Sequence, residues 1–122
     1  MAKVMIIEDE PNLLSLYKDE LEDEGYEVAA FTDGSEGLEL LKTFSPDVVV
    51  LDIKLGSGGG GMEILRAIKN HNKEIRVILN SAYSTFKNDF TTWMADAYIV
   101  KSSDLRELKS KIQELAPIQA KN

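Results

Sequence analysis

The chain has 122 residues, a length typical of one domain whose core needs no disulfide or metal to hold it together. It contains no cysteine, which excludes disulfides and thiolate metal sites and is compatible with a cytoplasmic setting. Its 14 basic and 21 acidic residues give a net charge of −7, which disfavours direct binding to nucleic acid or an anionic membrane, and its longest apolar runs, of four residues, are too short for membrane insertion.

The first part of the chain alternates apolar runs with amphipathic segments. Residues 3–7 and 26–30 predict strands. Pro11 favours the start of a helix that ends near Gly25, because proline suits the first helical turn and glycine the position after the last one. A second helix is predicted over residues 35–44, with Ser35 able to cap it.

The most informative stretch runs from Pro46 to Leu55. Its four consecutive apolar residues, Val48–Leu51, predict a strand buried on both faces, as in a parallel sheet. Asp52 follows directly and is therefore expected at the carboxyl end of that strand. In open α/β sheets this is the end at which ligands bind.

The rest of the chain continues the alternation after a glycine-rich loop at 56–61. The loop is a tolerated surface insertion or a mobile flap; it is not a P-loop, because Met62 and Glu63 follow it. The further predicted elements are a helix around 62–70, a strand at 75–79 followed by Asn80 and Ser81, a helix at 86–93, a strand at 97–100 followed by Lys101, and a helix at 105–115 that Pro117 ends. One domain is expected over residues 1–117, with a short tail at 118–122.

Five strands alternating with five helices predict an α/β fold with a doubly wound parallel sheet. In such a sheet the residues after the strands converge: Glu8, Asp9, Asp52, Ser81 and Lys101. Three adjacent carboxylates repel one another unless a cation joins them, and carboxylate oxygens suit Mg²⁺. A lysine and a hydroxyl can receive an anion. The set therefore favours phosphoryl transfer, with an aspartate as nucleophile.

Four motifs in order resemble the receiver domain of bacterial two-component response regulators over essentially the whole chain. They are Ile7–Pro11, Asp47–Ile53, Ser81-Ala82 and Ala97–Lys101. The resemblance implies a flavodoxin-like sheet with strand order 2-1-3-4-5. It also implies that Asp52 accepts a phosphoryl group from a sensor histidine kinase or a phosphotransfer protein.

The resemblance assigns a role to each remaining site residue. Asp9 and Asp52 bind Mg²⁺ by side chain, Lys54 by its backbone carbonyl, and Glu8 mainly through a metal-bound water. Lys101 and Ser81 contact phosphate oxygens, and Tyr98 changes rotamer as Ser81 moves. Where the family usually has Lys-Pro with a cis bond, this chain has Lys101-Ser102; we expect the bond to be cis so that Lys101 reaches the phosphate.

The implied output surface consists of the 86–93 helix, the 97–100 strand and the last helix. It would contact an unknown protein, with the chain a cytoplasmic monomer or weak dimer. The main alternative is that this chain is the receiver part of a longer regulator. A small phosphatase or a nucleotide-binding protein is less consistent with the sequence. A nucleotide-binding protein would need a glycine-rich phosphate loop where Glu8–Pro11 forms an acidic turn, and a phosphatase would turn over an added phosphomonoester.

Overall fold

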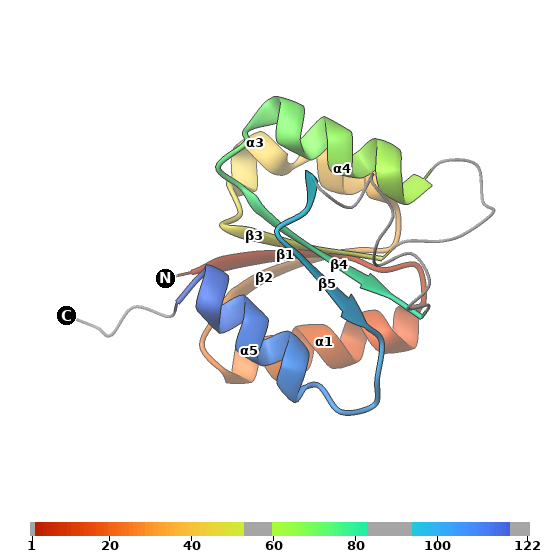
Figure 1. The fold of residues 1–122 in the computed structure, drawn as a ribbon, viewed down its shortest axis with the longest axis vertical. Helices are drawn as coiled ribbons and strands as arrows, with labels where there is room; N and C mark the ends of the chain where they lie inside the picture. The colour runs from red at the N-terminus through yellow and green to blue at the C-terminus, as the bar shows by residue number, and fades with distance from the viewer. Residues whose placement is uncertain (1, 53–59, 83–93, 118–122) are drawn as a thin grey trace.

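The computed structural model describes residues 2–52, 60–82 and 94–117. Its centre is a five-stranded, all-parallel sheet with the order β2-β1-β3-β4-β5, which confirms the predicted fold class (Figure 1). The strands are β1 Lys3–Ile7, β2 Glu27–Phe31, β3 Val48–Asp52, β4 Arg76–Ser81 and β5 Ala97–Val100.

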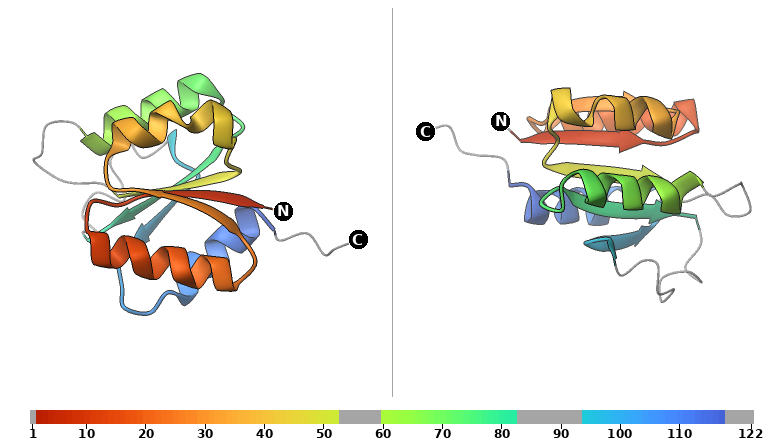
Figure 2. Two further views of the ribbon diagram at one scale, coloured as in Figure 1. Left: turned by 180° about the vertical axis from the view of Figure 1, so that it is seen from behind. Right: turned by 90° about the horizontal axis from the view of Figure 1, so that it is seen from above.

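Helices cover both faces of the sheet. Figure 2 shows α1 and α5 on one face and α2, α3 and α4 on the other. Their bounds are α1 Pro11–Asp23, α2 Gly34–Glu39, α3 Leu41–Phe44, α4 Gly60–His71 and α5 Arg106–Leu115.

The predicted helix over 35–44 is interrupted at Leu40, where the backbone (φ −97°, ψ 2°) leaves the helical region, so that α2 and α3 are separate. Gly37 weakens this segment, since a glycine inside a helix lowers helix stability by about 1 kcal/mol relative to alanine. Gly37 is buried so close to Ile7 that a β-carbon on residue 37 would lie 2.8 Å from the Ile7 Cδ1. Asp33, rather than the predicted Ser35, caps α2 by accepting a hydrogen bond from the Ser35 backbone N–H.

The predicted helix at 86–93, the greater part of the glycine-rich loop and the tail at 118–122 lie outside the described residues. The predicted strands at 3–7 and 97–100 are confirmed with the same bounds. Within the described ranges, no helix has the length and apolarity needed to cross a membrane.

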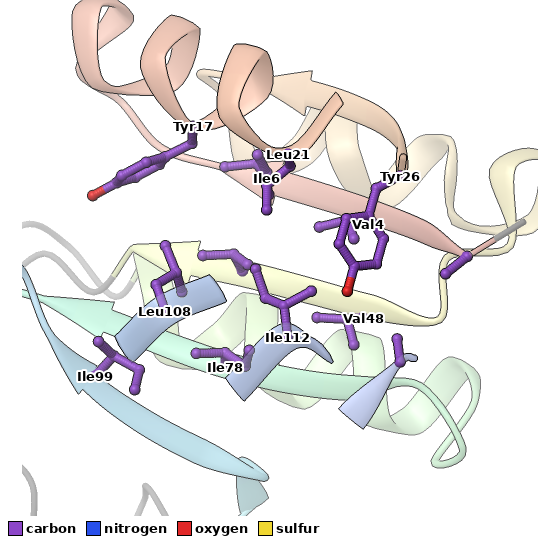
Figure 3. Close-up of a cluster of buried hydrophobic side chains, with 13 residues drawn as sticks. Val4, Ile6, Tyr17, Leu21, Tyr26, Val48, Ile78, Ile99, Leu108 and Ile112 are labelled. Atoms are coloured by element: carbon purple, nitrogen blue, oxygen red, sulfur yellow. The ribbon is translucent and has the colours of Figure 1, made fainter. Parts of the chain in front are cut away.

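The sheet separates two hydrophobic clusters. Figure 3 shows the one beneath α1 and α5, where alternate strand residues such as Ile6 and Ile78 meet Leu21 and Ile112. The second cluster lies under α2, α3 and α4 and includes Met5, Val49 and Leu65 among its members. Because β1, β3 and β4 are buried on both faces, they form a rigid base for the residues that follow them.

Candidate functional site

The carboxyl ends of β1 and β3 bring three carboxylates together. Glu8 and Asp9 follow β1, and Asp52 is the last residue of β3; one carboxylate oxygen from each lies within 4.8 Å of the others. The three residues differ in exposure, since Glu8 is buried, Asp52 is half-buried and Asp9 is exposed. The cluster is therefore open to solvent on one side and closed on the other.

Lys101, directly after β5, reaches into this cluster. Its Nζ lies 2.9 Å from Glu8 Oε1 and 3.0 Å from Asp52 Oδ1. We call Glu8, Asp9, Asp52 and Lys101 the acidic site. One ammonium group faces three carboxylates, so the site keeps an excess of negative charge.

The expectation of a cis bond between Lys101 and Ser102 is wrong, because the described backbone contains no cis peptide bond. A cis bond before a residue other than proline costs about 2.5–4 kcal/mol, and here nothing requires that cost. The backbone N–H of Lys101 donates to the Ser81 carbonyl at 2.6 Å, which continues the β4–β5 pairing. From that position the lysine side chain is long enough to reach both carboxylates.

The surroundings of Asp52 raise its pKa from 3.8 to about 6. Burial is the main cause, and the neighbouring carboxylates of Glu8 and Asp9 add to it, while the Lys101 ammonium acts in the opposite direction. The pKa of Lys101 is itself raised: burial alone would lower it, but its contacts with Glu8 and Asp52 outweigh burial. The lysine therefore stays charged at every physiological pH.

The donor set of the acidic site fits a hard divalent cation. Three carboxylates supply only oxygen ligands, which Mg²⁺ prefers, and their joint negative charge is only partly compensated. Although Lys101 is near, Glu8 Oε1 is buried and accepts no hydrogen bond of good geometry within the described part of the chain. A buried oxygen that can still accept a hydrogen bond is suited to receive one from a water molecule bound to a cation.

The other predicted site residues occupy distinct positions. Ser81 is fully buried as the last residue of β4, one position beyond the Asp52–Asn80 pair. Tyr98 lies on β5 beside Leu79 and packs against the cluster under α4. Lys54 lies outside the described residues, so its role as a backbone ligand remains a prediction.

Two residues that the sequence did not assign to the site lie beside it. Asn80 is paired with Asp52 across β3 and β4, and its Nδ2 donates to the Tyr17 hydroxyl of α1 at 3.0 Å. The sequence does mark Asn80 as a candidate, because it is a polar residue at the end of an apolar strand. Tyr17 gave no such signal, because its position on the apolar face of the helix predicts a core residue.

Comparison with known proteins gives the same family from sequence and from structure. A family model described as the response regulator receiver domain matches residues 4–113. Response regulator ArlR of Staphylococcus saprophyticus is 35% identical over 116 residues, which is 94% of this chain and 52% of that protein. ArlR of Staphylococcus aureus is 34% identical over the same share. The chain thus spans about half the length of these curated relatives.

Solved structures are similar over nearly the whole chain. Response regulator TrrA of Thermotoga maritima, in complex with Mg²⁺ and BeF, matches with a TM-score of 0.87 and 38% identity, over 94% of this chain and 99% of that one. A complex of histidine kinase ThkA with TrrA matches with a TM-score of 0.85 and 37% identity, over 94% of this chain and 98% of the matched chain. A CheY-like receiver domain protein of Methanospirillum hungatei gives a TM-score of 0.84 at 30% identity, over 93% of this chain and 92% of the matched chain.

Proposed function

Because the chain belongs to the response regulator receiver domain family, we propose that it is a signalling switch that accepts a phosphoryl group on Asp52. The observation that carries the proposal is the position of this carboxylate. It ends a buried strand, lies 3.0 Å from the Lys101 ammonium and belongs to a cluster of three acidic residues. A receiver is a signalling module, and its chemistry is confined to its own phosphorylation and dephosphorylation.

The proposed step transfers a phosphoryl group from a phosphohistidine. An ionised Asp52 oxygen attacks the phosphorus, a new O–P bond forms, and the N–P bond breaks with its electron pair returning to the imidazole nitrogen. With a pKa of about 6, Asp52 is mainly ionised at neutral pH even before a cation is bound. Mg²⁺, held by Asp9 and Asp52, by Glu8 through water and by the Lys54 carbonyl, would supply charge compensation for the phosphoryl oxygens.

The residues around Asp52 would then respond to the added charge. Lys101, already beside Asp52, pairs with one phosphoryl oxygen, and the Ser81 hydroxyl donates a hydrogen bond to another. Tyr98 follows Ser81 by changing rotamer. The signal leaves through β5, α5 and the segment 86–93, toward an output protein.

The phosphoryl donor that we propose is a histidine kinase or a phosphotransfer protein. Support comes from the TrrA complex with histidine kinase ThkA, to which this chain is similar. A cytoplasmic location, and a monomeric or weakly dimeric state without DNA contacts by this chain, belong to the same proposal. A second candidate is the receiver part of a longer regulator, favoured by the ArlR relatives, which are about twice as long.

Intact-protein mass spectrometry after incubation with acetyl phosphate tests the proposal. We expect a mass increase of one phosphoryl group in the wild type with Mg²⁺, and no increase with a chelator or in Asp52→Asn. Asp33→Asn is the matched control, because Asp33 also lies near the carboxyl ends of the strands but outside the acidic site, and asparagine retains its capping function.

Two outcomes would contradict the proposal. One is phosphorylation that persists in Asp52→Asn, and the other is a wild type that neither gains mass nor binds beryllofluoride with Mg²⁺. Beryllofluoride binding without a mass increase would instead show an intact site that needs its own kinase as phosphoryl donor or whose acyl phosphate is hydrolysed faster than it is detected.

A further inference from the structure

Asn80 of β4 lies beside the acidic site, next to Asp52 of β3. It pairs in register with Asp52, so the two side chains are neighbours on the same face of the sheet, the face that α1 covers. Only 2% of Asn80 is exposed, and the residues that precede it in β4 are apolar from Val77 to Leu79. An amide in this position needs a hydrogen-bond partner, since an unpartnered buried polar group is costly.

Tyr17 of α1 is that partner. Its hydroxyl receives the Asn80 Nδ2 hydrogen bond at 3.0 Å, and only 1% of the residue is exposed. Figure 3 shows the Tyr17 hydroxyl pointing away from the other labelled side chains of the apolar cluster. The hydrogen bond therefore connects α1 to the strand next to Asp52 across 63 residues of sequence.

The Tyr17 hydroxyl also lies within the electric field of the acidic site. Its pKa is raised chiefly by burial; the Asn80 hydrogen bond opposes this, Glu8 and Asp52 raise it further, and Lys101 lowers it. The charges of three of the site residues therefore act on the phenol.

Packing alone does not require a buried polar pair at this position. Replacing both partners by apolar groups of the same shape is often neutral for stability. The same hydrogen bond becomes valuable where a neighbouring reactive group must be held in one geometry, because reactive side chains depend on a supporting shell.

We propose that Tyr17 and Asn80 are positioning residues, whose hydrogen bond fixes the amide beside Asp52 and thereby holds the acceptor carboxylate in the geometry for phosphorylation. The part of this inference that concerns phosphorylation rests on the proposed function. The part that concerns coupling between the pair and Asp52 does not.

A double-mutant cycle tests the coupling without any phosphorylation. Tyr17→Phe, Asp52→Asn and the combined variant are unfolded in urea with a chelator present. We expect the change in midpoint of the combined variant to differ from the sum of the single changes. Tyr26→Phe is the matched control: Tyr26 lies in the same cluster and its hydroxyl bonds to Gln113, so its combination with Asp52→Asn should be additive. Additive changes for Tyr17 as well would overturn the proposal.

A second experiment separates positioning from packing. Tyr17→Phe and Asn80→Leu each leave one polar group buried without its partner, whereas the variant with both changes removes both groups. We expect this double variant to recover much of the urea midpoint lost by the single variants, yet to react with acetyl phosphate about tenfold more slowly than wild type at saturating Mg²⁺. A wild-type rate in the double variant would overturn the proposal.

The two experiments distinguish the failure of each idea. If the wild type is not phosphorylated on Asp52, the proposed function fails and the urea cycle alone decides whether the pair is coupled to Asp52. If the wild type is phosphorylated and the double variant is equally fast, only the positioning role fails.

Discussion

Asp52 is held in surroundings that oppose its charge. Its pKa in the folded protein, about 6, exceeds the ordinary value of 3.8 because burial and the charge of Glu8 outweigh the attraction of Lys101. A group with a raised pKa binds its proton more tightly in the folded state. Its stabilising contribution is complete below pH 3.8 and is lost as the pH rises through 6. At neutral pH the ionised carboxylate therefore destabilises the cation-free protein.

Asp52→Asn should stabilise the cation-free protein at neutral pH. We expect its free energy of unfolding to rise by about 1–3 kcal/mol at pH 7.5, because the amide has no charge to bury, and the gain to shrink toward pH 4. Urea denaturation with a chelator across this pH range measures the effect. A gain that does not vary with pH, or a loss at pH 7.5, would contradict the electrostatic explanation.

The control for this prediction is Asp33→Asn. The pKa of Asp33 is lowered by hydrogen bonds from Ser35, the opposite of the shift at Asp52. Asp33→Asn should therefore give no gain in stability at neutral pH.

At the scale of elements, Asp96 connects α4, β4 and the start of β5. Its carboxylate accepts hydrogen bonds from Lys69 Nζ at 2.9 Å and from the Val77 backbone N–H at 2.8 Å, and Arg76 Nη1 lies 3.3 Å away. Burial would raise the pKa of Asp96, but these donors outweigh it and lower the pKa. The ionised carboxylate therefore stabilises the fold above the ordinary pKa, and this contribution is lost as the pH falls.

Asp96→Ala should destabilise the protein by about 1–3 kcal/mol at pH 7, because it leaves the Val77 N–H without its acceptor and the Lys69 ammonium with only the Ile75 carbonyl. The loss should be smaller at pH 3, because the contribution of the ionised carboxylate to stability declines once the pH falls below the ordinary pKa of 3.8. Urea denaturation at both pH values tests this. Asp104→Asn, which removes the charge of an exposed carboxylate that contacts Arg106 but keeps an oxygen for the Arg106 backbone N–H, should leave the midpoint nearly unchanged; equal effects of the two variants would rule out a specific role for Asp96.

The strands and their end residues could be predicted from sequence for a physical reason. A run such as Val48–Leu51 suits little other than a doubly buried strand, and parallel strands necessarily bring their end residues together. Glu8, Asp9 and Asp52 are therefore found where they were expected. The strand order came from the resemblance to the receiver family and agrees with the structure.

Other features depend on tertiary contacts that local sequence does not encode. The interruption at Leu40 accompanies the close approach of Gly37 to Ile7, a contact between distant segments. The hydrogen bond between Tyr17 and Asn80 forms only when β4 has its observed register in the sheet and α1 turns Tyr17 toward it. The trans bond after Lys101 was missed because sequence gives the cost of a cis bond but not the reach of the lysine side chain.

At the scale of the whole molecule, the acidic site should couple cation binding to stability. A ligand that binds only the folded state stabilises it by RT ln(1 + [L]/Kd), about 2.7 kcal/mol at a concentration one hundred times Kd. We expect Mg²⁺ to raise the thermal unfolding temperature reversibly, and chelation to restore the original value. Asp9→Asn should greatly reduce the shift, whereas Asp33→Asn should keep it; an undiminished shift in Asp9→Asn would place the cation elsewhere.

β5 is an edge strand, and this position bears on how a signal would pass through the molecule. Asp52 ends β3, which is paired with a neighbour on each side, whereas β5, among the described strands, is paired with β4 alone. Displacing β3 would break its backbone hydrogen bonds to two neighbouring strands, whereas displacing β5 would break those to one. Tyr98 lies on β5 and Lys101 follows it. If Asp52 is phosphorylated as proposed, the input would be received on a central strand, and the groups expected to transmit it would lie on, or directly after, an edge strand whose displacement breaks the pairing with one neighbour instead of two.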